Sequence, residues 1–265
     1  MDNLSTNNKH INNDFQAVKM YQTEMIMIFV ILLYISSMFL DVLFPKYCVG
    51  CNSLGTVLCK SCRKDIRPTL QDVCPYCFRN SPRGTTHDRC KKENSLDGAI
   101  SVVRYNTIAR KIVKGIKYRL AYDIYNQIVD TLPGHWWRTD LYTNLSATET
   151  IIQPIPLHPS RKKIRGFNQA DIIASVLSRQ TKIATIDSLQ RVKNTRPQAM
   201  IPTKKQRTEN IKNAFSVRDK SIISQKTVIL VDDIFTSAST AKEAAKVLKK
   251  EGAAAVLLYT FAHGS

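Results

Sequence analysis

The residues with the clearest chemistry form the stretch VILVDDIFTSAST, from Val228 to Thr240. Its apolar run is typical of a strand buried on both faces of a parallel sheet. Asp232 and Asp233 then fall at the carboxyl end of that strand, where open α/β sheets bind ligands. The hydroxyl residues after them precede a helix, whose N-terminal amides suit a phosphate. The stretch therefore predicts a sugar-phosphate site, with the carboxylates on ribose hydroxyls and the loop on the 5′-phosphate.

This stretch resembles the motif with which type I phosphoribosyltransferases bind phosphoribosyl pyrophosphate (PRPP). The resemblance implies Mg²⁺ bound with PRPP, catalytic roles for Asp232 and Asp233, and a phosphate-binding loop made of Thr236, Ser237, Ala238, Ser239 and Thr240. Alanine at position 238 departs from the family, which usually has glycine there, and an L-residue with positive φ costs roughly 1–2 kcal/mol. A solvated turn or a Walker B strand are the other interpretations of the aspartate pair, but no G-x-x-x-x-G-K-[ST] sequence occurs.

Eight candidate metal ligands occur as four pairs, each separated by two residues, within residues 46–95: Cys48, Cys51, Cys59, Cys62, Cys74, Cys77, His87 and Cys90. Each pair can present two ligands to a tetrahedral Zn²⁺ ion, so the set predicts a double zinc ribbon with one or two structural zinc sites. The spacing allows the pairs to combine sequentially or in an interleaved order. The odd total of seven cysteines argues against a disulfide framework. A redox role for the CPYC sequence at Cys74 lacks a βαβ context.

A second anion-binding segment is expected after another buried strand, over residues 151–157. The sequence RKKIRGFNQA follows and leads into a helix whose apolar residues recur from Phe167 to Leu177. We expect its basic residues to lie at the entry to that helix and to face pyrophosphate. Arg165, Asn168 and Gln169 are the candidates for this side of the site.

The remaining segments predict an α/β fold. Strands are expected over residues 99–105 and 253–262, and helices over 108–120 and 241–250. Between residues 191 and 207 the chain has many basic residues and no acid, and Pro197 and Pro202 argue against a continuous helix. We predict a mobile cationic loop that closes over PRPP or contacts nucleic acid. The alternation of strands and helices predicts a type I phosphoribosyltransferase-like, mainly parallel sheet flanked by helices.

The N-terminal segment differs from the rest in composition. Residues 1–24 are polar and are expected to be a disordered lead, and residues 25–44 are almost entirely apolar. The apolar run approaches the roughly 20 residues that span a bilayer, and the basic chain after it would then stay on the cytoplasmic side. An apolar helix packed on the protein's own core and an upstream start codon are the alternatives. The formal net charge of +18 attracts polyanions such as nucleic acid.

RGFNQA, FPKYC, the cysteine pairs and VDDIFTSAST together resemble the ComF family, amidophosphoribosyltransferase-like proteins linked to DNA uptake in natural competence. The resemblance covers roughly residues 42–262, with the motifs in the family's order. We expect a disordered lead and apolar helix over residues 1–45, the double zinc ribbon over 46–95 and the phosphoribosyltransferase-like domain over 96–265.

The resemblance implies a cytoplasmic protein that supports uptake of transforming single-stranded DNA, at the inner face of the membrane if residues 25–44 associate with it. It implies three kinds of partner: PRPP or a related sugar phosphate, single-stranded DNA, and competence-machinery proteins such as a helicase or a DNA-processing factor. Two alternatives stay open. One is an active phosphoribosyltransferase of nucleotide metabolism, and the other is a DNA-binding adaptor whose transferase site has decayed.

Overall fold

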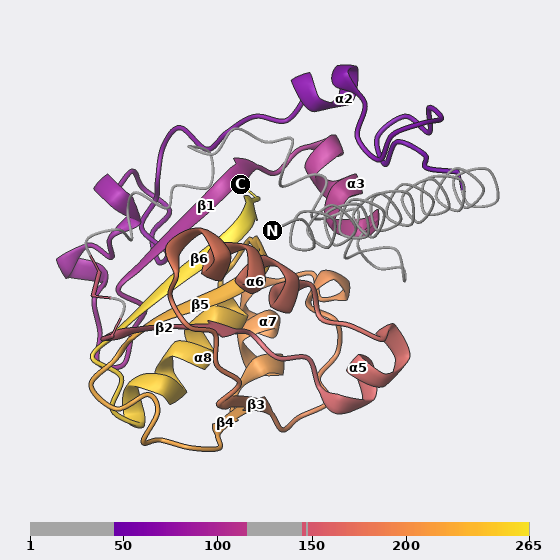
Figure 1. Ribbon diagram of the computed structural model, residues 1–265. Helices are drawn as coiled ribbons and strands as arrows, with labels where there is room; N and C mark the ends of the chain where they lie inside the picture. The colour runs from indigo at the N-terminus through magenta and orange to yellow at the C-terminus, as the bar shows by residue number, and fades with distance from the viewer. Residues whose placement is uncertain (1–44, 116–144, 147, 265) are drawn as a thin grey trace, which may run out of the picture. The chain divides into compact units, whose positions relative to one another are not determined.

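The structure is a computed structural model that describes residues 45–115, 145, 146 and 148–264 (Figure 1). The described strands are β1 (Gly98–Arg104), β2 (Thr150–Pro154), β3 (Leu189–Arg191), β4 (Phe215–Val217), β5 (Thr227–Phe235) and β6 (Ala255–His263). The described α-helices are α2 (Lys60–Lys64), α3 (Thr107–Gly115), α5 (Pro159–Arg165), α6 (Gln169–Thr181), α7 (Lys204–Ile211) and α8 (Ser239–Lys250). Short 3-10 turns are η1 (Pro82–Gly84), η2 (Asp88–Cys90) and η5 (Gln198–Met200).

Four strands form one parallel sheet in the order β1-β6-β5-β2. The two central strands have long buried runs, residues 228–231 in β5 and 258–262 in β6. Continuous burial is what a parallel strand needs when helices cover both faces of its sheet. Strands β3 and β4 pair antiparallel in a separate two-stranded sheet. The predicted α/β fold with a mainly parallel sheet is therefore confirmed.

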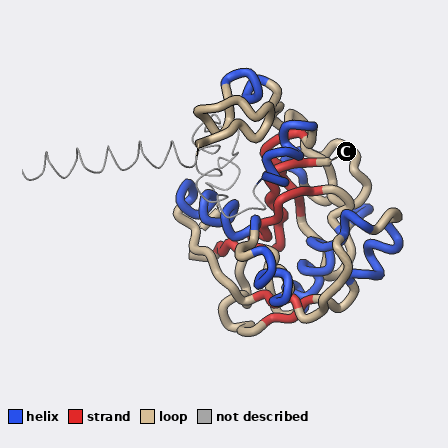
Figure 2. The backbone as a smooth tube through the Cα atoms, turned by 90° about the vertical axis from the view of Figure 1, so that its right-hand side faces the viewer, coloured by secondary structure: helices blue, strands red, loops and turns tan. Residues whose placement is uncertain are grey.

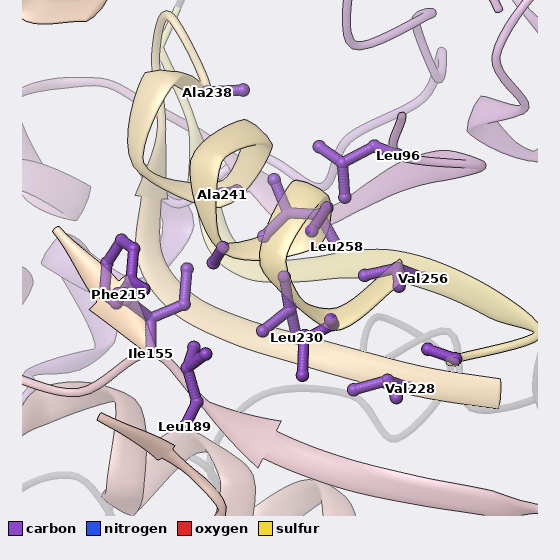
Figure 3. Close-up of a cluster of buried hydrophobic side chains, with 14 of the residues drawn as sticks. Leu96, Ile155, Leu189, Phe215, Val228, Leu230, Ala238, Ala241, Val256 and Leu258 are labelled. Carbon is purple, nitrogen blue, oxygen red and sulfur yellow. The ribbon is translucent and has the colours of Figure 1, made fainter. Parts of the chain in front are cut away.

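Helix α8 covers one face of the two central strands. Its buried alanines and Leu248 pack on side chains that share this face: Val228, Leu230, Val256 and Leu258 (Figure 3). Because side chains alternate along a strand, Ile229 and Val231 point to the other face. Helix α6 contacts β2 and β5, and Figure 2 shows helices on both sides of the strands. The sheet is thus held rigidly enough to carry a site at the ends of its strands.

Two basic segments form helices that the sequence analysis did not expect. Residues 159–165 form α5, which begins with Pro159 in its first turn and ends at Gly166 with φ 79°. Proline is favourable at a helix start and glycine at a left-handed helix end, so both residues explain the extra helix. The basic cluster therefore lies on α5 and not at the entry to α6. Similarly, η5 and the first half of α7 occupy part of the segment 191–207, where a loop was expected; Thr203 caps α7.

Contacts divide the chain into two units. The described part of the first unit is residues 45–48 and 53–56, a turn in which the N–H of Cys48 donates to the carbonyl of Ser53 at 2.9 Å. The second unit contains the other described residues and, apart from Cys48, every candidate site residue. Within the described ranges, the helices are too short or too polar to cross a membrane. The apolar segment 25–44 lies outside the described residues, and the expected domain boundaries stay a prediction.

Candidate functional site

The aspartate pair lies where β5 extends past its neighbour β2. The pairing of these strands ends at Pro154 and Val231, but β5 continues to Phe235 along β6. Asp232 and Asp233 are therefore in the second half of β5, beyond the end of its pairing with β2, on the side of the sheet where ligands of α/β proteins bind. The N–H of Asp233 donates to Oδ1 of Asp232 at 2.9 Å, which fixes the orientation of the first carboxylate.

The electrostatics of this pair favour a bound cation. Burial raises the pKa of Asp232 well above its usual range, and the charge of Asp233 raises it further. The guanidinium of Arg191 acts in the opposite direction. Two adjacent carboxylates with this much desolvation are costly to ionise together, so a cation or a set of hydroxyl donors beside them would stabilise the ionised form.

The hydroxyl-rich loop after β5 is organised by its own side chains and by α8. The Oγ atoms of Ser237 and Ser239 are 2.9 Å apart, and Nζ of Lys242 donates to the carbonyl of Ser237 at 3.2 Å. Because Lys242 lies on α8, this hydrogen bond links the loop to the helix. The loop and the first N–H groups of α8 together form the kind of helix N-terminus that binds phosphate.

Ala238 has the left-handed conformation for which glycine is suited. Its φ and ψ are 53° and 15°, and it is the N-cap residue of α8. The Cβ atom of an L-residue crowds the backbone there, at a cost of roughly 1–2 kcal/mol. Its methyl group is buried in the cluster between α8 and the sheet (Figure 3). The loop therefore keeps the backbone geometry of a glycine-containing turn in spite of the substitution.

Arg191 of β3 acts on the aspartate pair, and basic side chains of α5 lie close to Arg191. Arg161 of α5 donates to the carbonyl of Thr195, and Nη2 of Arg191 donates to Oγ1 of the same threonine at 2.6 Å. Burial and the charges of Arg161 and Arg165 lower the pKa of Arg191, whereas the charge of Asp232 raises it, and the combined effect is a pKa of about 10. These four charged groups are thus close enough to influence one another, and the three arginines, Arg161, Arg165 and Arg191, form a cationic wall beside Asp232.

Asn168 and Gln169, which we expected to shape the pyrophosphate side, are both buried. Asn168 is the N-cap of α6: its Oδ1 accepts from the N–H of Ala170 at 3.4 Å, and its Nδ2 donates to the carbonyl of Ile155 at 3.0 Å. Its amide therefore fixes the turn between β2 and α6. Nε2 of Gln169 is buried and has no hydrogen-bond partner among the described residues. A direct role of either residue at pyrophosphate stays a prediction.

The segment between β3 and β4 reaches the phosphate-binding loop. Nε2 of Gln198 lies 3.4 Å from Oγ1 of Thr240 and 3.3 Å from the carbonyl oxygen of Arg207. Nε of Arg207 in turn donates to the carbonyl of Ile201 at 2.8 Å. The sequence predicted that part of this segment, residues 191–207, closes over PRPP, but the contact with Thr240 was not predicted. No local pattern could have indicated it, because it joins residues 42 positions apart.

The second set of metal ligands is assembled in one place. Its ligand atoms all lie within 4.8 Å of one another, and they come from Cys74, Cys77, His87 and Cys90. Nδ1 of His87 is 3.3 Å from Sγ of Cys77, and Nε2 of His87 lies 3.1 Å from the carbonyl oxygen of Asn80. A histidine ligand is commonly held through its other ring nitrogen in this way. Burial alone would raise the pKa of the Cys74 thiol, but backbone hydrogen bonds, that of Cys77 foremost, lower it to about 7.

The first set of ligands is assembled from the preceding cysteines. The sulfur atoms of Cys51, Cys59 and Cys62 lie within 4.8 Å of one another, with Cys51 and Cys59 at 3.7 Å. The second set uses four consecutive ligands, so Cys48 is left for the first. The ligands therefore combine sequentially, and the interleaved order that the spacing also allowed is excluded. None of the seven cysteines, which all lie in the described ranges, is in a disulfide bond.

The turn that contains the second ligand set packs against the end of β5 and the first turn of α8. Nζ of Lys242 lies 4.5 Å from the centre of the Tyr76 ring, and the Phe78 ring stacks on Phe235 with centroids 5.7 Å apart. Nζ of Lys204, on α7, lies 4.9 Å from the centre of the Phe78 ring. Burial, followed by the charge of Lys204, lowers the pKa of Lys242 to about 8. No pattern in the sequence indicated this contact between the zinc-ligand turn and the end of β5.

Two family models match separate parts of the chain. Residues 164–265 match the phosphoribosyl transferase domain, and residues 39–91 match the double zinc ribbon domain. The first match contains the aspartate pair, the phosphate-binding loop and most of the cationic wall. The second contains all eight metal ligands and ends one residue after Cys90. The matches therefore coincide with the two groups of functional side chains described above.

Curated relatives match along most of the chain. Competence protein F of Haemophilus influenzae is 31% identical over 207 residues, which are 74% of this chain and 85% of the relative. Competence protein ComFC of Bacillus subtilis is 27% identical over 211 residues, 75% of this chain and 80% of the relative. DNA utilization protein YhgH of Escherichia coli K12 is 27% identical over 207 residues, 76% of this chain and 88% of the relative.

Proposed function

The chain belongs to the ComF family, the family of competence protein F, and from this premise we propose that it supports the uptake of transforming single-stranded DNA through a site that binds PRPP or a related sugar phosphate. One observation carries the proposal. The aspartate pair of β5, the hydroxyl loop at the start of α8 and the arginines of α5 and β3 surround the same end of the sheet. Carboxylates, phosphate-binding amides and cations are the three groups that a ribose with two phosphorylated positions requires.

Each part of the site has a role in this proposal. Asp232 and Asp233 accept hydrogen bonds from the ribose hydroxyls or bind Mg²⁺, for which carboxylate oxygens are suitable ligands. Ser237, Ser239 and the N-terminus of α8 hold the 5′-phosphate. The arginines of α5 and Arg191 bind the pyrophosphate group and stabilise the negative charge that develops when it leaves. Mg²⁺, when bound, neutralises part of the same charge.

The segment between β3 and β4 covers the site. Through Gln198 it already contacts Thr240 of the phosphate-binding loop. In a phosphoribosyl transfer the bond between the ribose and pyrophosphate weakens before the acceptor arrives, so water must be kept away from the sugar. A segment that joins the cationic wall to the phosphate loop is in the right position to exclude it.

Zinc has a structural role in this proposal. The donor sets fit the metal, because seven thiols and one imidazole divide into two groups of four, as closed tetrahedral zinc sites require. Bound zinc would fix the turns that carry Tyr76 and Phe78, and these rings contact α8 and the end of β5. The zinc module therefore supports the phosphate-binding loop without taking part in the chemistry.

Single-stranded DNA is the second proposed ligand. The net charge of +18 supports this, since a strongly basic protein attracts the phosphates of a DNA strand. The relatives named competence protein F, ComFC and DNA utilization protein point to the same substrate class. In this proposal the protein acts on the cytoplasmic side, at the inner face of the membrane if residues 25–44 associate with it. A helicase or a DNA-processing factor of the competence machinery is the expected protein partner.

Two further candidates are each favoured by one observation. The paired aspartates and the cationic wall favour an active phosphoribosyltransferase of nucleotide metabolism. The strained backbone of Ala238 favours a DNA-binding adaptor whose transferase site has decayed. Release of pyrophosphate from PRPP in the presence of an acceptor distinguishes them, because only the enzyme would produce it.

Calorimetric titration of the full chain with PRPP and Mg²⁺ tests the proposed site. We expect binding by the wild type and its loss in the double variant Asp232→Asn and Asp233→Asn, with unchanged zinc content. Glu251→Gln, which removes an exposed carboxylate at the far end of α8, is the matched control and should bind normally. Equal binding by the wild type and the double variant would show that the sugar phosphate does not use the aspartate pair.

A further inference from the structure

A cavity of about 570 Å³ lies beyond the carboxyl end of β2, between the turn from α5 to α6 and strand β3. Its volume is in the range of roughly 300–1,000 Å³ that small-molecule sites occupy. Of the described residues, those that line it do not include the aspartate pair or the phosphate-binding loop 236–240. The cavity thus borders the proposed sugar-phosphate site and shares Arg191 with it, but its other walls are built from different side chains.

One wall of the cavity is apolar and rigid. It contains Pro154, Pro156, Leu157 and Pro159, and Ile186 contributes from another side. Each proline fixes its own backbone angle, so this wall changes shape little when a ligand binds. A row of rings and one leucine offers a surface on which a planar base can pack. Gln190, which is half-buried in the lining, offers both a donor and an acceptor for the edge of such a base.

The rim of the cavity has an excess of positive charge. Four cationic side chains and two carboxylates line it. Both carboxylates form ion pairs: Asp171 with Lys162 at 3.7 Å and Asp187 with Arg218 at 3.5 Å. Within the described part of the chain, the other two cations, Lys163 and Arg191, form no ion pair. The uncompensated charge matches that of a phosphate monoester at neutral pH, which is close to two negative charges.

Arg191 has the features of a side chain that awaits a ligand. It is 8% exposed, and its Nε is buried without a hydrogen-bond partner among the described residues. Its Nη2 is held by Oγ1 of Thr195 at 2.6 Å, and its Cζ lies 5.6 Å from the centre of the Phe215 ring. The guanidinium is therefore fixed in position while one donor is unused. A buried donor without an acceptor is costly, and a phosphate oxygen is the acceptor that arginine binds best.

We propose that this cavity binds a nucleoside monophosphate, either free or as one unit of a single-stranded DNA, with the base on the proline wall and the phosphate at Arg191 and Lys163. The inference goes beyond the sugar-phosphate site and does not depend on it. If the ligand is a unit of a strand, the cavity is the place where the protein holds DNA next to its transferase-like site.

The test measures binding of dTMP by calorimetry and of a fluorescent short oligothymidylate by anisotropy, with the full zinc-loaded chain. Ser175→Trp places a large ring in the cavity from an exposed position of α6, and Ser175→Ala is its control. Arg218→Ala removes an exposed cation of the rim, and Lys220→Ala removes an exposed cation outside the lining. None of these four variants changes a buried residue, so each should fold and keep its zinc.

We expect dTMP binding to weaken about tenfold or more in Ser175→Trp and Arg218→Ala and to be unchanged in the two controls. If binding of the oligothymidylate weakens in the same variants, the natural ligand is a unit of a strand. If binding of the oligothymidylate is unchanged, the ligand is a free nucleotide. PRPP titrations of the same four variants should match the wild type, whereas Asp232→Asn should retain dTMP binding. Failure of PRPP binding in the wild type would therefore affect only the proposed function.

Three results would overturn the inference. The first is that the wild type binds neither dTMP nor the oligothymidylate. The second is equal dTMP affinity in Ser175→Trp and Ser175→Ala, which would mean that only the charge of the rim attracts the phosphate. The third is loss of dTMP binding in Asp232→Asn, which would place the nucleotide at the aspartate pair and not in the cavity.

Discussion

The zinc-ligand groups and the sugar-phosphate site differ in how their residues are brought together. The second zinc group takes all its ligands from residues 74–90, whereas the sugar-phosphate site takes side chains from α5, β3, β5 and α8, between residues 161 and 242. The zinc group is formed by local turns that carry two ligands each. The sugar-phosphate site is formed only when the strands of the sheet pair in the correct register. The zinc groups should therefore fail one at a time, whereas the sugar-phosphate site should respond to changes in several distant elements.

The largest effect is expected from loss of a zinc ligand. Cys90→Ser should reduce bound zinc from two ions per chain to one, because each group has its own four ligands. A structural zinc ion supplies on the order of 10 kcal/mol of binding free energy, so residues 74–90 should unfold while the α/β sheet stays intact. The amount of zinc released to a chelator measures the loss of the ion, and limited proteolysis measures the unfolding of residues 74–90. Asp88→Asn, at an exposed position between the ligands, should keep both ions; loss of both in Cys90→Ser would mean that the groups are not independent.

A smaller effect should come from the contact that joins the two regions. Lys242→Met removes the hydrogen bond to the carbonyl of Ser237 and the contact with the Tyr76 ring. Because that hydrogen bond holds the phosphate-binding loop, we expect PRPP affinity to fall about tenfold, with zinc content unchanged. Calorimetry checks this against Lys246→Met, which changes an exposed lysine one turn later. Equal affinities in the two variants would show that the loop keeps its shape without the zinc-ligand turn.

This contact marks the limit of what the sequence could predict. The zinc ligands, β5 and α8 were predictable because their signals are local: fixed spacings, an apolar run and a helical stripe. The contact of Arg161 with Thr195, the contact of Gln198 with Thr240 and the packing of Phe78 on Phe235 were not. They depend on which distant turns the completed sheet brings together. Helix α5 was missed for a different reason, since its few residues have no apolar stripe and only Pro159 and Gly166 mark its ends.

At the aspartate pair, unlike at the zinc groups, a substitution that abolishes ligand binding should raise the stability of the fold. Because the pKa of Asp232 is raised in the folded chain, its contribution favours folding most below its unfolded pKa and is lost as the pH rises through the folded pKa. Asp232→Asn removes the charge and can still accept from the N–H of Asp233. We expect the variant to gain on the order of 1 kcal/mol in free energy of unfolding at about pH 8 and less at about pH 5.

Urea unfolding at both pH values measures this difference, and PRPP titration shows the matching loss of binding. Glu251→Gln, an exposed carboxylate, should give no comparable pH-dependent gain. A destabilised Asp232→Asn variant at the higher pH would mean that attraction to Arg191 outweighs burial and the repulsion from Asp233.

The smallest effect is expected at Ala238, where backbone strain is confined to one residue of the long-range site. Ala238→Gly relieves roughly 1–2 kcal/mol of left-handed strain but loses a buried methyl group and gains entropy in the unfolded chain, roughly 0.5–1 kcal/mol. The net result should be a gain of about 0.5 kcal/mol in free energy of unfolding, measured with urea. Ala241→Gly, in the regular first turn of α8, should instead lose about 1 kcal/mol, because glycine there has no strain to relieve. If both variants lost stability equally, the φ of 53° at Ala238 would carry no strain. PRPP titration of the same glycine variant distinguishes two functional alternatives. A gain in PRPP affinity would show that alanine has weakened a working site. An unchanged affinity would show that the loop binds phosphate equally well with either residue.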